Sequence, residues 1–421
     1  MTASTLSSAT SAPLSEGTGL SLKKRLARSE RRRKLQAALL VAPLLLFILF
    51  TFAAPIGKLL WRAVHSPEVA EGLPKTAQMI QAWDGKSVPE EAVFVALAQD
   101  LDTAYAEQRL AVPAKRLNYD SPGMLSLLMK AGRKVASFES ENLRQQFIDA
   151  DPRWGEVETW RVIRNASSSY TDFFLLHALD LTRSASGEIV SVSDDEAIHL
   201  DILYRTFWIS ALVTAACLAL SYPLAWLLAN LPAKTANLLM ICVLLPFWTS
   251  LLVRTTAWIV LLQNNGVVNQ VMQLMGLFDA PVQLIFNRFG VVVAMTHVLL
   301  PFMILPLYSV MKSIPPVYAR AAASLGANPW TVFWKVYVPQ TLPGVGAGCL
   351  LVFIMAVGYY ITPALVGGPR DQMLSYFVAL HTNETLNWSM AAALAAVLFA
   401  ATLVLYAIYS RLVGVNNMKL G

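Results

Sequence analysis

The sequence predicts an all-α integral membrane protein, with six transmembrane helices and a large, mainly helical extracytoplasmic insertion between helices 1 and 2. Composition is the first observation: 56% of the 421 residues are hydrophobic and only 14% are charged, whereas about a quarter of the residues in a soluble domain are charged. Charge distribution is the second, because 22 of the 27 acidic residues lie between Ser66 and Ile202, together with 13 Lys and Arg. The rest of the chain is basic and strongly apolar, so we expect a bilayer to be its solvent.

Six apolar segments are each long enough to cross a bilayer, for which about 20 residues suffice. They cover residues 35–61, 203–231, 236–262, 289–310, 344–366 and 388–412. The predicted organisation is a disordered basic cytoplasmic tail (1–34), transmembrane helix 1 (35–62), a periplasmic insertion (63–202), a core of transmembrane helices 2–6 (203–412) and a second cytoplasmic tail (413–421).

The orientation follows from a basic run, Lys23 to Lys34, that directly precedes the first apolar segment. Basic residues next to a membrane helix stay in the cytoplasm, so we expect the N-terminus inside, and six spans return the C-terminus inside. The alternative is a cleaved signal peptide, but its hydrophobic region has only about 7–15 residues. We do not expect this run to bind nucleic acid.

The insertion is long enough for a small domain. Apolar residues recur at helical spacing in 89–109, 123–135 and 140–150, which predicts helices there. Two interpretations remain open: an insertion that only covers the outer mouth of the membrane core, or a docking surface for a soluble partner.

The loop between the fourth and fifth apolar segments has a distinctive pattern. Its Ala-rich stretch 319–325 favours a short helix, which Gly326 then breaks. A second short amphipathic helix is expected over 330–337, and Pro339 and Pro343 are expected to end it before the next span. The product would be a helix–turn–helix knob suited to a groove in a partner.

This stretch resembles the EAA coupling loop of binding-protein-dependent ABC importer permeases. Ala321, Ala322 and Gly326 match the family pattern, and Pro339 closes an apolar unit at the expected spacing. Arg320 is a departure, because the family often has Glu there; this weakens any polar pairing carried over to that position. We call residues 312–342 the coupling loop. Its candidate ATPase-coupling residues are Arg320, Ala321, Ala322, Gly326, Pro329, Phe333 and Pro339.

A narrower resemblance covers more of the chain. Residues 245–258 and 346–369 are similar to segments of spermidine/putrescine-type permeases. The resemblance implies the six-helix fold of ABC importer permeases, residence in the bacterial inner (plasma) membrane, and a polyamine substrate. It also implies three partners: a cytoplasmic ABC ATPase dimer, a second permease subunit and a soluble periplasmic substrate-binding protein.

The chain itself has no Gly-x-x-x-x-Gly-Lys-Ser/Thr phosphate loop, which a nucleotide site of that kind requires. We therefore expect it to bind no cofactor, with ATP and Mg at the partner ATPase subunits, and we do not expect it to be an enzyme.

Five residues are candidates for the translocation path. Arg254 lies deepest in an apolar run, and a charge at the bilayer centre costs about 2.5–3.5 kcal/mol on insertion scales. It should therefore face protein, water or the interface, either as a structural pair or in a gate. The aromatics Trp248, Trp258, Tyr359 and Tyr360 either pack or hold organic cations by cation–π attraction.

Two other function classes are weighed against the importer. None of the six apolar segments contains Asp or Glu, which argues against a proton- or sodium-coupled secondary transporter. A membrane receptor with an extracytoplasmic sensor domain leaves the coupling loop unexplained.

The three cysteines (Cys217, Cys242 and Cys349) are expected to be small buried hydrophobes rather than metal ligands. Asp371 and Glu384 are expected to be solvated charges of an outer loop.

Overall fold

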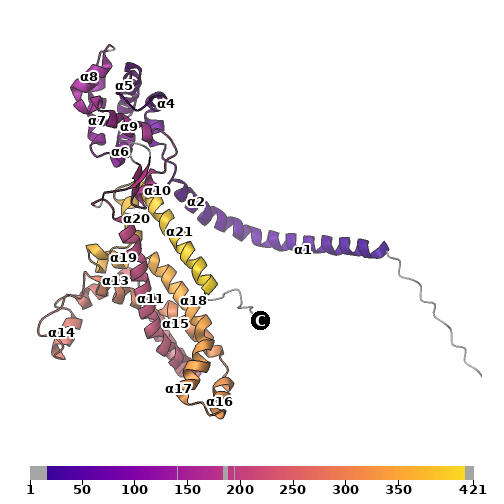
Figure 1. Ribbon diagram of the computed structural model, residues 1–421. Coiled ribbons are helices and arrows are strands. Elements are labelled where there is room, and N and C mark those ends of the chain that lie inside the picture. The colour runs from indigo at the N-terminus through magenta and orange to yellow at the C-terminus, as the bar shows by residue number, and fades with distance from the viewer. Residues whose placement is uncertain (1–16, 140, 184–187, 194, 413–421) are drawn as a thin grey trace, which may run out of the picture. The chain divides into compact units, whose positions relative to one another are not determined.

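A computed structural model describes residues 17–139, 141–183, 188–193 and 195–412 (Figure 1). Residues 1–16 and 413–421, which belong to the two predicted tails, lie outside the described residues. The chain divides into two compact units, Met1–Leu59 and Leu60–Gly421.

The described part of the first unit is a continuous helical run made of α1 (Gly17–Ile48), the π-helical turn η1 (Leu49–Ala53) and most of α2 (Ala54–Trp61), whose last two residues belong to the second unit. Within it, Gln36–Trp61 is long and apolar enough to cross a membrane. The prediction of a disordered segment over 1–34 is wrong for residues 17–34, which are helical. Most of these residues are Lys, Arg, Leu and Ser, and the first three have high helix propensity.

The inserted domain consists of short helices and one two-stranded antiparallel sheet (Figure 1). Its elements are α3 (Glu68–Gly72), α4 (Pro74–Ile80), α5 (Glu91–Ala106), α6 (Ala111–Asp120), α7 (Met124–Lys134), η2 (Val135–Ser137), α8 (Leu143–Ala150), η3 (Pro152–Gly155), α9 (Val157–Ala166), α10 (Phe173–His177), β1 (Leu181–Arg183) and β2 (Ile189–Ser191). The three predicted helices correspond to α5, α7 and α8.

An aromatic cluster forms the core of the inserted domain. Phe94, Phe147, Trp154 and Trp160 are fully buried. The ring centroids of Phe94 and Trp160 lie 4.6 Å apart, and Trp160 Nε1 donates a hydrogen bond of 2.9 Å to Trp154 O. The insertion is therefore a domain with its own hydrophobic core.

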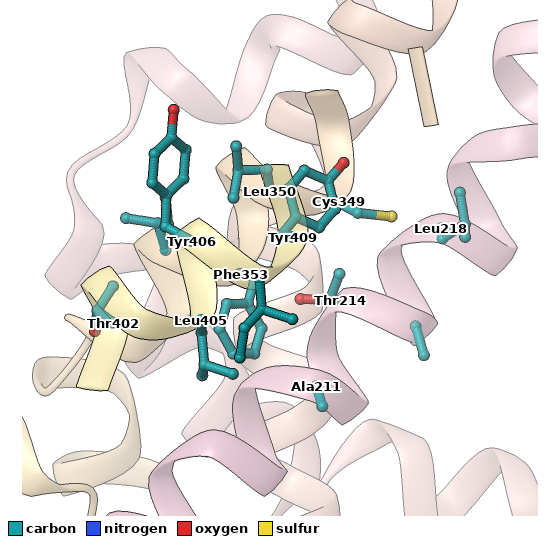
Figure 2. A pocket seen from close by; sticks show the side chains of 13 residues that line it. Ala211, Thr214, Leu218, Cys349, Leu350, Phe353, Thr402, Leu405, Tyr406 and Tyr409 are labelled. Carbon is teal, nitrogen blue, oxygen red and sulfur yellow. The ribbon is translucent and has the colours of Figure 1, made fainter. Parts of the chain in front are cut away.

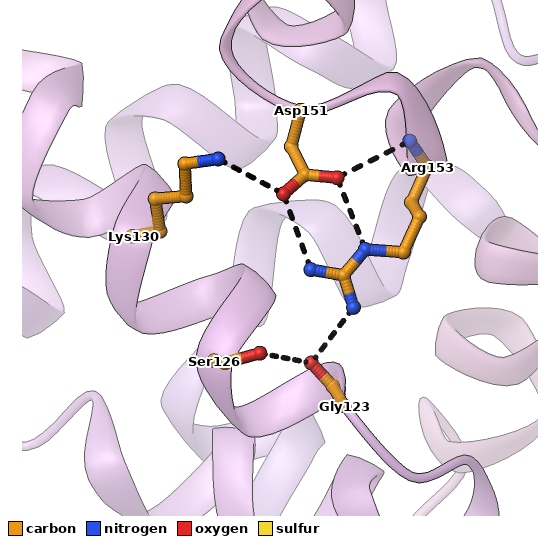
Figure 3. Close-up of polar contacts among 5 residues, drawn as sticks. All are labelled: Gly123, Ser126, Lys130, Asp151 and Arg153. Carbon is orange, nitrogen blue, oxygen red and sulfur yellow. Dashed lines mark hydrogen bonds and ion pairs between the residues drawn. The ribbon is translucent and has the colours of Figure 1, made fainter.

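A polar network joins η3 to α7 in this domain (Figure 3). Asp151 accepts hydrogen bonds from Arg153 Nε (3.0 Å) and Lys130 Nζ (3.1 Å). Arg153 Nη1 and Ser126 Oγ both donate to Gly123 O, at 3.2 and 2.8 Å. The Arg153 side chain, followed by that of Lys130, holds the pKa of Asp151 well below its usual range.

The membrane core contains the remaining elements. They are α11 (His199–Asn230), α12 (Ala233–Leu244), η4 (Leu245–Trp248), α13 (Leu251–Leu262), α14 (Val267–Leu274), α15 (Arg288–Ser313), α16 (Val317–Ser324), α17 (Pro329–Val332), η5 (Phe333–Tyr337), α18 (Val338–Val357), α19 (Ile361–Val366), η6 (Pro369–Asp371), α20 (Leu374–Asn383) and α21 (Trp388–Leu412). Five helices of the described chain are long and apolar enough to span a membrane, or six if the bent α12–α14 segment counts as one span.

Helices α11, α15 and α18 pack together as the centre of this core (Figure 1). Two glycines of α18 permit close approach to α15: a Cβ at Gly344 would lie 2.9 Å from Val310 Cβ, and one at Gly348 would lie 2.7 Å from Met303 Sδ. Small residues at helix contacts are how membrane helices pack closely, since lipid provides no hydrophobic drive for association.

Two predicted spans differ from the structure. Segment 236–262 is not one helix, because α12 and η4 meet α13 at a bend of 97°. Pro246 removes a backbone donor, and Ser250, in extended conformation, starts a new helix by accepting a hydrogen bond from Val253 N. Segment 344–366 is likewise interrupted, since α18 ends at Val357 and α19 begins only at Ile361.

The predicted stop at Pro339 and Pro343 is also wrong, because one helix runs over Pro329–Val357. The π-helical turn η5 precedes Pro339, and Val338 N donates to Phe333 O, five residues back. A π turn shifts the hydrogen-bond pattern within a helix, so the ring of Pro339 enters at the start of α18 without ending the helix.

Several contacts join the inserted domain to the membrane core, among them the packing of α10 against α21 and two sets of polar contacts. Asp180 caps the start of α11 by accepting from His199 N (3.0 Å) and Leu200 N (2.8 Å). Lys115 Nζ donates to Thr385 O, just after α20, at 2.5 Å. The capping aspartate thus fixes the chain where it leaves the insertion and enters α11.

An apolar pocket of about 420 Å³ lies between α11, α18 and α21 (Figure 2). Cys349 lines it together with Phe353 and Tyr409. Cys217 is buried in the core, as predicted, whereas Cys242 on α12 is exposed, so the expectation of burial is wrong there.

Candidate functional site

The turn after α16 is built around Gly326. This residue has a φ of +86°, in the left-handed region that only glycine adopts without strain. Ala327 N donates to Ala322 O (3.1 Å) and Gly326 N donates to Ala323 O (3.0 Å). These two bonds form a Schellman motif, which satisfies carbonyls that the helix end leaves free.

The second half of the coupling loop starts immediately. Asn328 Oδ1 accepts a hydrogen bond of 2.7 Å from Thr331 N, and Pro329 occupies the first helical turn. Both are typical helix-start residues. The turn between the two short helices is therefore only a few residues long and conformationally fixed at both ends.

Phe333 connects the coupling loop to the membrane core. Its ring stacks on Tyr337, with centroids 6.0 Å apart, and meets Tyr222 of α11 edge-on at 6.4 Å. Tyr222 OH hydrogen bonds to Thr341 Oγ1 of α18 at 3.1 Å. Phe333 of η5, stacked on Tyr337, is therefore in contact with α11 through Tyr222, which is bonded to α18.

A second contact fixes the base of the loop. Lys312 Nζ donates to Ala229 O at 3.0 Å, and Ala229 lies in the last turn of α11, where carbonyls lack intrahelical donors and favour a cation. A cavity of about 740 Å³ lies between these helix ends and α16.

The outer surface of the coupling loop is exposed and largely apolar. Leu325 is 89% exposed, Trp330 71% and Trp334 50%. Arg320 and Ala321 are exposed on α16, while Ala322 is half-buried. An apolar surface of this kind next to a tight turn is typical of a protein-docking site.

A polar cluster lies where the broken helices meet. Trp258 Nε1 of α13 donates to His297 Nδ1 of α15 at 3.1 Å, and Thr255 Oγ1 lies 3.2 Å from Thr362 Oγ1. His297 is nine residues from the start of α15, or roughly 13 Å at 1.5 Å per residue. His297 therefore lies in the middle part of α15, a helix of 26 residues that is long enough to cross a hydrocarbon core of about 30 Å.

Three of the five predicted path residues belong to this cluster. Arg254 interacts electrostatically with both His297 and Tyr359, and Trp258 is bonded to the same histidine. The structure does not bring the other two into it: Trp248 lies before the helix break and is 80% exposed.

Tyr360 precedes α19 and is 40% exposed. The sequence reasoning missed His297, Thr255 and Thr362. A polar residue inside an apolar segment was the available signal.

Asp371 corrects a further expectation. It is buried rather than solvated, and its Oδ1 pairs with Arg288 Nε at 3.1 Å. This ion pair joins the start of α15 to η6. Glu384, in contrast, is exposed as expected. The described residues contain no group of three or more His, Cys, Asp and Glu that could hold a metal ion.

Comparison with known proteins gives a consistent result. A family model for the binding-protein-dependent transport system inner membrane component matches residues 221–417. The chain is 31% identical over 224 residues to the spermidine/putrescine transport system permease protein PotB of Escherichia coli strain K12, covering 53% of this chain and 82% of that protein. It is 32% identical over 222 residues to PotB of Haemophilus influenzae, with 53% and 78% coverage.

Among solved structures, a bacterial ABC transporter involved in the import of the acidic polysaccharide alginate matches with a TM-score of 0.46 and 16% identity, over 53% of this chain and 81% of that one. The residues matched by the family model include the coupling loop and the polar cluster, and they exclude the inserted domain.

Proposed function

Because this chain belongs to the family of binding-protein-dependent transport system inner membrane components, we propose that it forms half of the translocation path for a polyamine such as spermidine or putrescine. It is a multi-pass inner-membrane permease of an ABC importer and therefore a transport component rather than an enzyme. The polyamine assignment is taken from the PotB relatives, which are 31% and 32% identical to this chain over the aligned residues.

We propose that the coupling loop receives the movement of a cytoplasmic ATPase dimer. The observation that carries this proposal is the Schellman turn at Gly326, which presents the exposed apolar residues Leu325 and Trp330 on a rigid knob. The Phe333–Tyr222 contact supports it, because it links the knob to α11. Under this proposal the loop and both termini lie in the cytoplasm, in agreement with the basic run before the first span.

The proposed path runs past the polar cluster. Helix breaks at Ser250 and Gly358 leave backbone groups without helical partners, and such groups are tolerated at membrane depth only where protein or a water-filled path satisfies them. Trp258 and Tyr359 present aromatic faces there, and aromatic rings attract ammonium groups.

Uptake of labelled putrescine and spermidine tests the proposal. Cells expressing this chain with its neighbouring transporter genes are compared with a strain that lacks only this chain. Uptake that requires both the chain and ATP would support the importer and the polyamine together. Absence of uptake would remove the polyamine assignment, and amine-free solutes would be screened next.

We further propose that the inserted domain docks the soluble periplasmic binding protein. Its independent core and its attachment to α11 and α20 give it a defined position on the membrane core. Deletion of residues 70–195 should abolish binding of the substrate-binding protein to reconstituted complexes. As a control, the truncated chain must still co-purify with the ATPase. Unchanged affinity for the binding protein would reject the docking role and favour a domain that only covers the outer mouth of the membrane core.

A further inference from the structure

Arg254 is the one charged residue of α13 (Leu251–Leu262), an otherwise apolar helix that starts at the break after Ser250. Its Nε is buried, and no described residue accepts a hydrogen bond from it or forms an ion pair with it. The nearby groups are the ring of His297 and the phenol of Tyr359, neither of which carries a negative charge at neutral pH. The residue as a whole is half-buried, and a counter-charge would stabilise its guanidinium, because an unpaired charge within a membrane segment is costly.

The membrane core of this chain, residues 203–412, has few residues that could supply that counter-charge. From residue 203 to residue 412 it contains only three acidic residues, Asp279, Asp371 and Glu384. Asp371 is paired with Arg288, and the other two are exposed in loops. The first span, Gln36–Trp61, contains no Asp or Glu, so its position in the membrane does not change this conclusion.

Within the second unit, the surface beside Arg254 is apolar and exposed. On the same helix, Leu252 is 58% exposed, Val253 61% and Val260 55%, and Trp248 before the break is 80% exposed. An apolar helix face that adjoins an unpaired cation is complementary to another membrane helix that carries an acidic residue. Polar contacts of this kind hold membrane helices together.

We infer that a helix of a second, different permease subunit covers this face of α13 and places a carboxylate against Arg254. A second copy of this chain cannot do so, because none of its spans contains a carboxylate and it would bring another arginine to the interface. The substrate cannot do so either if it is a polyamine, which has only amino groups. The inference thus rests on the proposed function, in which two permeases share one path.

Charge reversal tests the inference in the whole transporter. The tagged chain is co-expressed with the second permease and the ATPase, and the amount of second permease that co-purifies is measured for Arg254→Glu, Arg254→Gln and Arg254→Lys. Lys234→Glu is the matched control, since it makes the same change of charge at an exposed residue of α12. We expect Arg254→Glu to reduce co-purification by about tenfold, the scale of a polar contact between membrane helices, and Lys234→Glu to leave it unchanged.

Suppressor selection identifies the partner residue. Variants of the second permease that restore assembly with Arg254→Glu should replace an Asp or Glu of a membrane span by Lys or Arg. The same second-permease variant should fail to assemble with wild-type Arg254.

Three results would overturn the inference. One is wild-type assembly of Arg254→Glu. Another is normal assembly with loss of uptake alone, which would assign the counter-charge to the substrate. The last is co-purification of two differently tagged copies of this chain in a working transporter. Assembly needs no substrate, so lack of polyamine uptake together with the expected assembly defect would reject the polyamine and keep the interface.

Discussion

Replacement of Gly326 by Val separates the coupling role of the loop from its contribution to stability. Valine at a φ of +86° carries a left-handed strain of about 1–2 kcal/mol. The added side chain itself clashes with nothing, since no atom lies within 4 Å of a Cβ built there. The cost is therefore purely conformational.

The strain is relieved locally. If the residue leaves the left-handed region, the hydrogen bonds to Ala322 O and Ala323 O are lost, at about 1 kcal/mol each. The end of α16 would then loosen while the membrane core, which these bonds do not touch, stays folded. Since 1.4 kcal/mol corresponds to a factor of ten, we expect ATP-dependent uptake to fall about tenfold in Gly326→Val, with ATP hydrolysis by the complex retained.

The assay compares uptake with ATP hydrolysis in the same reconstituted vesicles. Gly276→Val is the matched control, because Gly276 also has a positive φ, +69°, and open space around its Cβ, but lies after α14, far in sequence from the loop. Gly326→Asn should be nearly normal, because Asn tolerates the left-handed region. Equal uptake in Gly326→Val and Gly276→Val would refute the reasoning.

Three further predictions address the rest of the molecule. Trp258→Phe removes the hydrogen bond to His297 and should lower uptake severalfold while the chain still inserts and assembles; unchanged transport would exclude this bond from the path. Gly344→Val introduces a Cβ 2.9 Å from Val310 and should lower the thermal stability of the purified complex, which a melting curve identical to wild type would contradict. Asp151 has a depressed pKa when folded, so its stabilising contribution is present above the unfolded pKa of about 3.9 and is lost as the pH falls through the lower folded value. Asp151→Asn should therefore lower the free energy of unfolding at pH 7 by about 2 kcal/mol. The difference in stability between variant and wild type should disappear in acid. A difference that stays constant with pH, measured by tryptophan fluorescence, would argue against the ion pairs.

Local signals made parts of this fold predictable from the sequence. The hydrogen bonds of the turn at Gly326 join residues that are at most five positions apart in the sequence. The end of α16 could therefore be predicted from the glycine and the alanines before it. The spans were visible because a membrane helix needs a long apolar run regardless of its neighbours. Three helices of the insertion, α5, α7 and α8, followed from periodicity alone, whereas α3, α4, α6, α9 and α10 were not predicted.

Contacts between distant segments were not predictable in the same way. Asp371 appeared to be a solvated loop residue, because its partner Arg288 lies 83 residues earlier. No acidic, basic or metal-ligating residue lies near His297 in the sequence at a spacing that would predict a site. Its hydrogen bond to Trp258 forms because α13 packs against α15 in the folded chain. Pro339 predicted the end of a helix, but the π-helical turn before it allowed the helix to continue. Whether a membrane helix continues through a proline depends on how the freed backbone groups are satisfied, which the proline itself does not reveal.

Helix α15 connects the two parts of the proposed mechanism. It runs from the coupling loop at Ser313 to His297, a length of about 24 Å at 1.5 Å per residue. Close packing against Gly344 and Gly348 means that the half of α15 nearest the loop moves together with α18. Pro301 has no N–H and so leaves the carbonyl of His297, four residues earlier, without its helical donor. Bending is easiest at such a point, so we propose that a push from the coupling loop rotates the part of α15 that carries His297, whose Nδ1 accepts the hydrogen bond from Trp258.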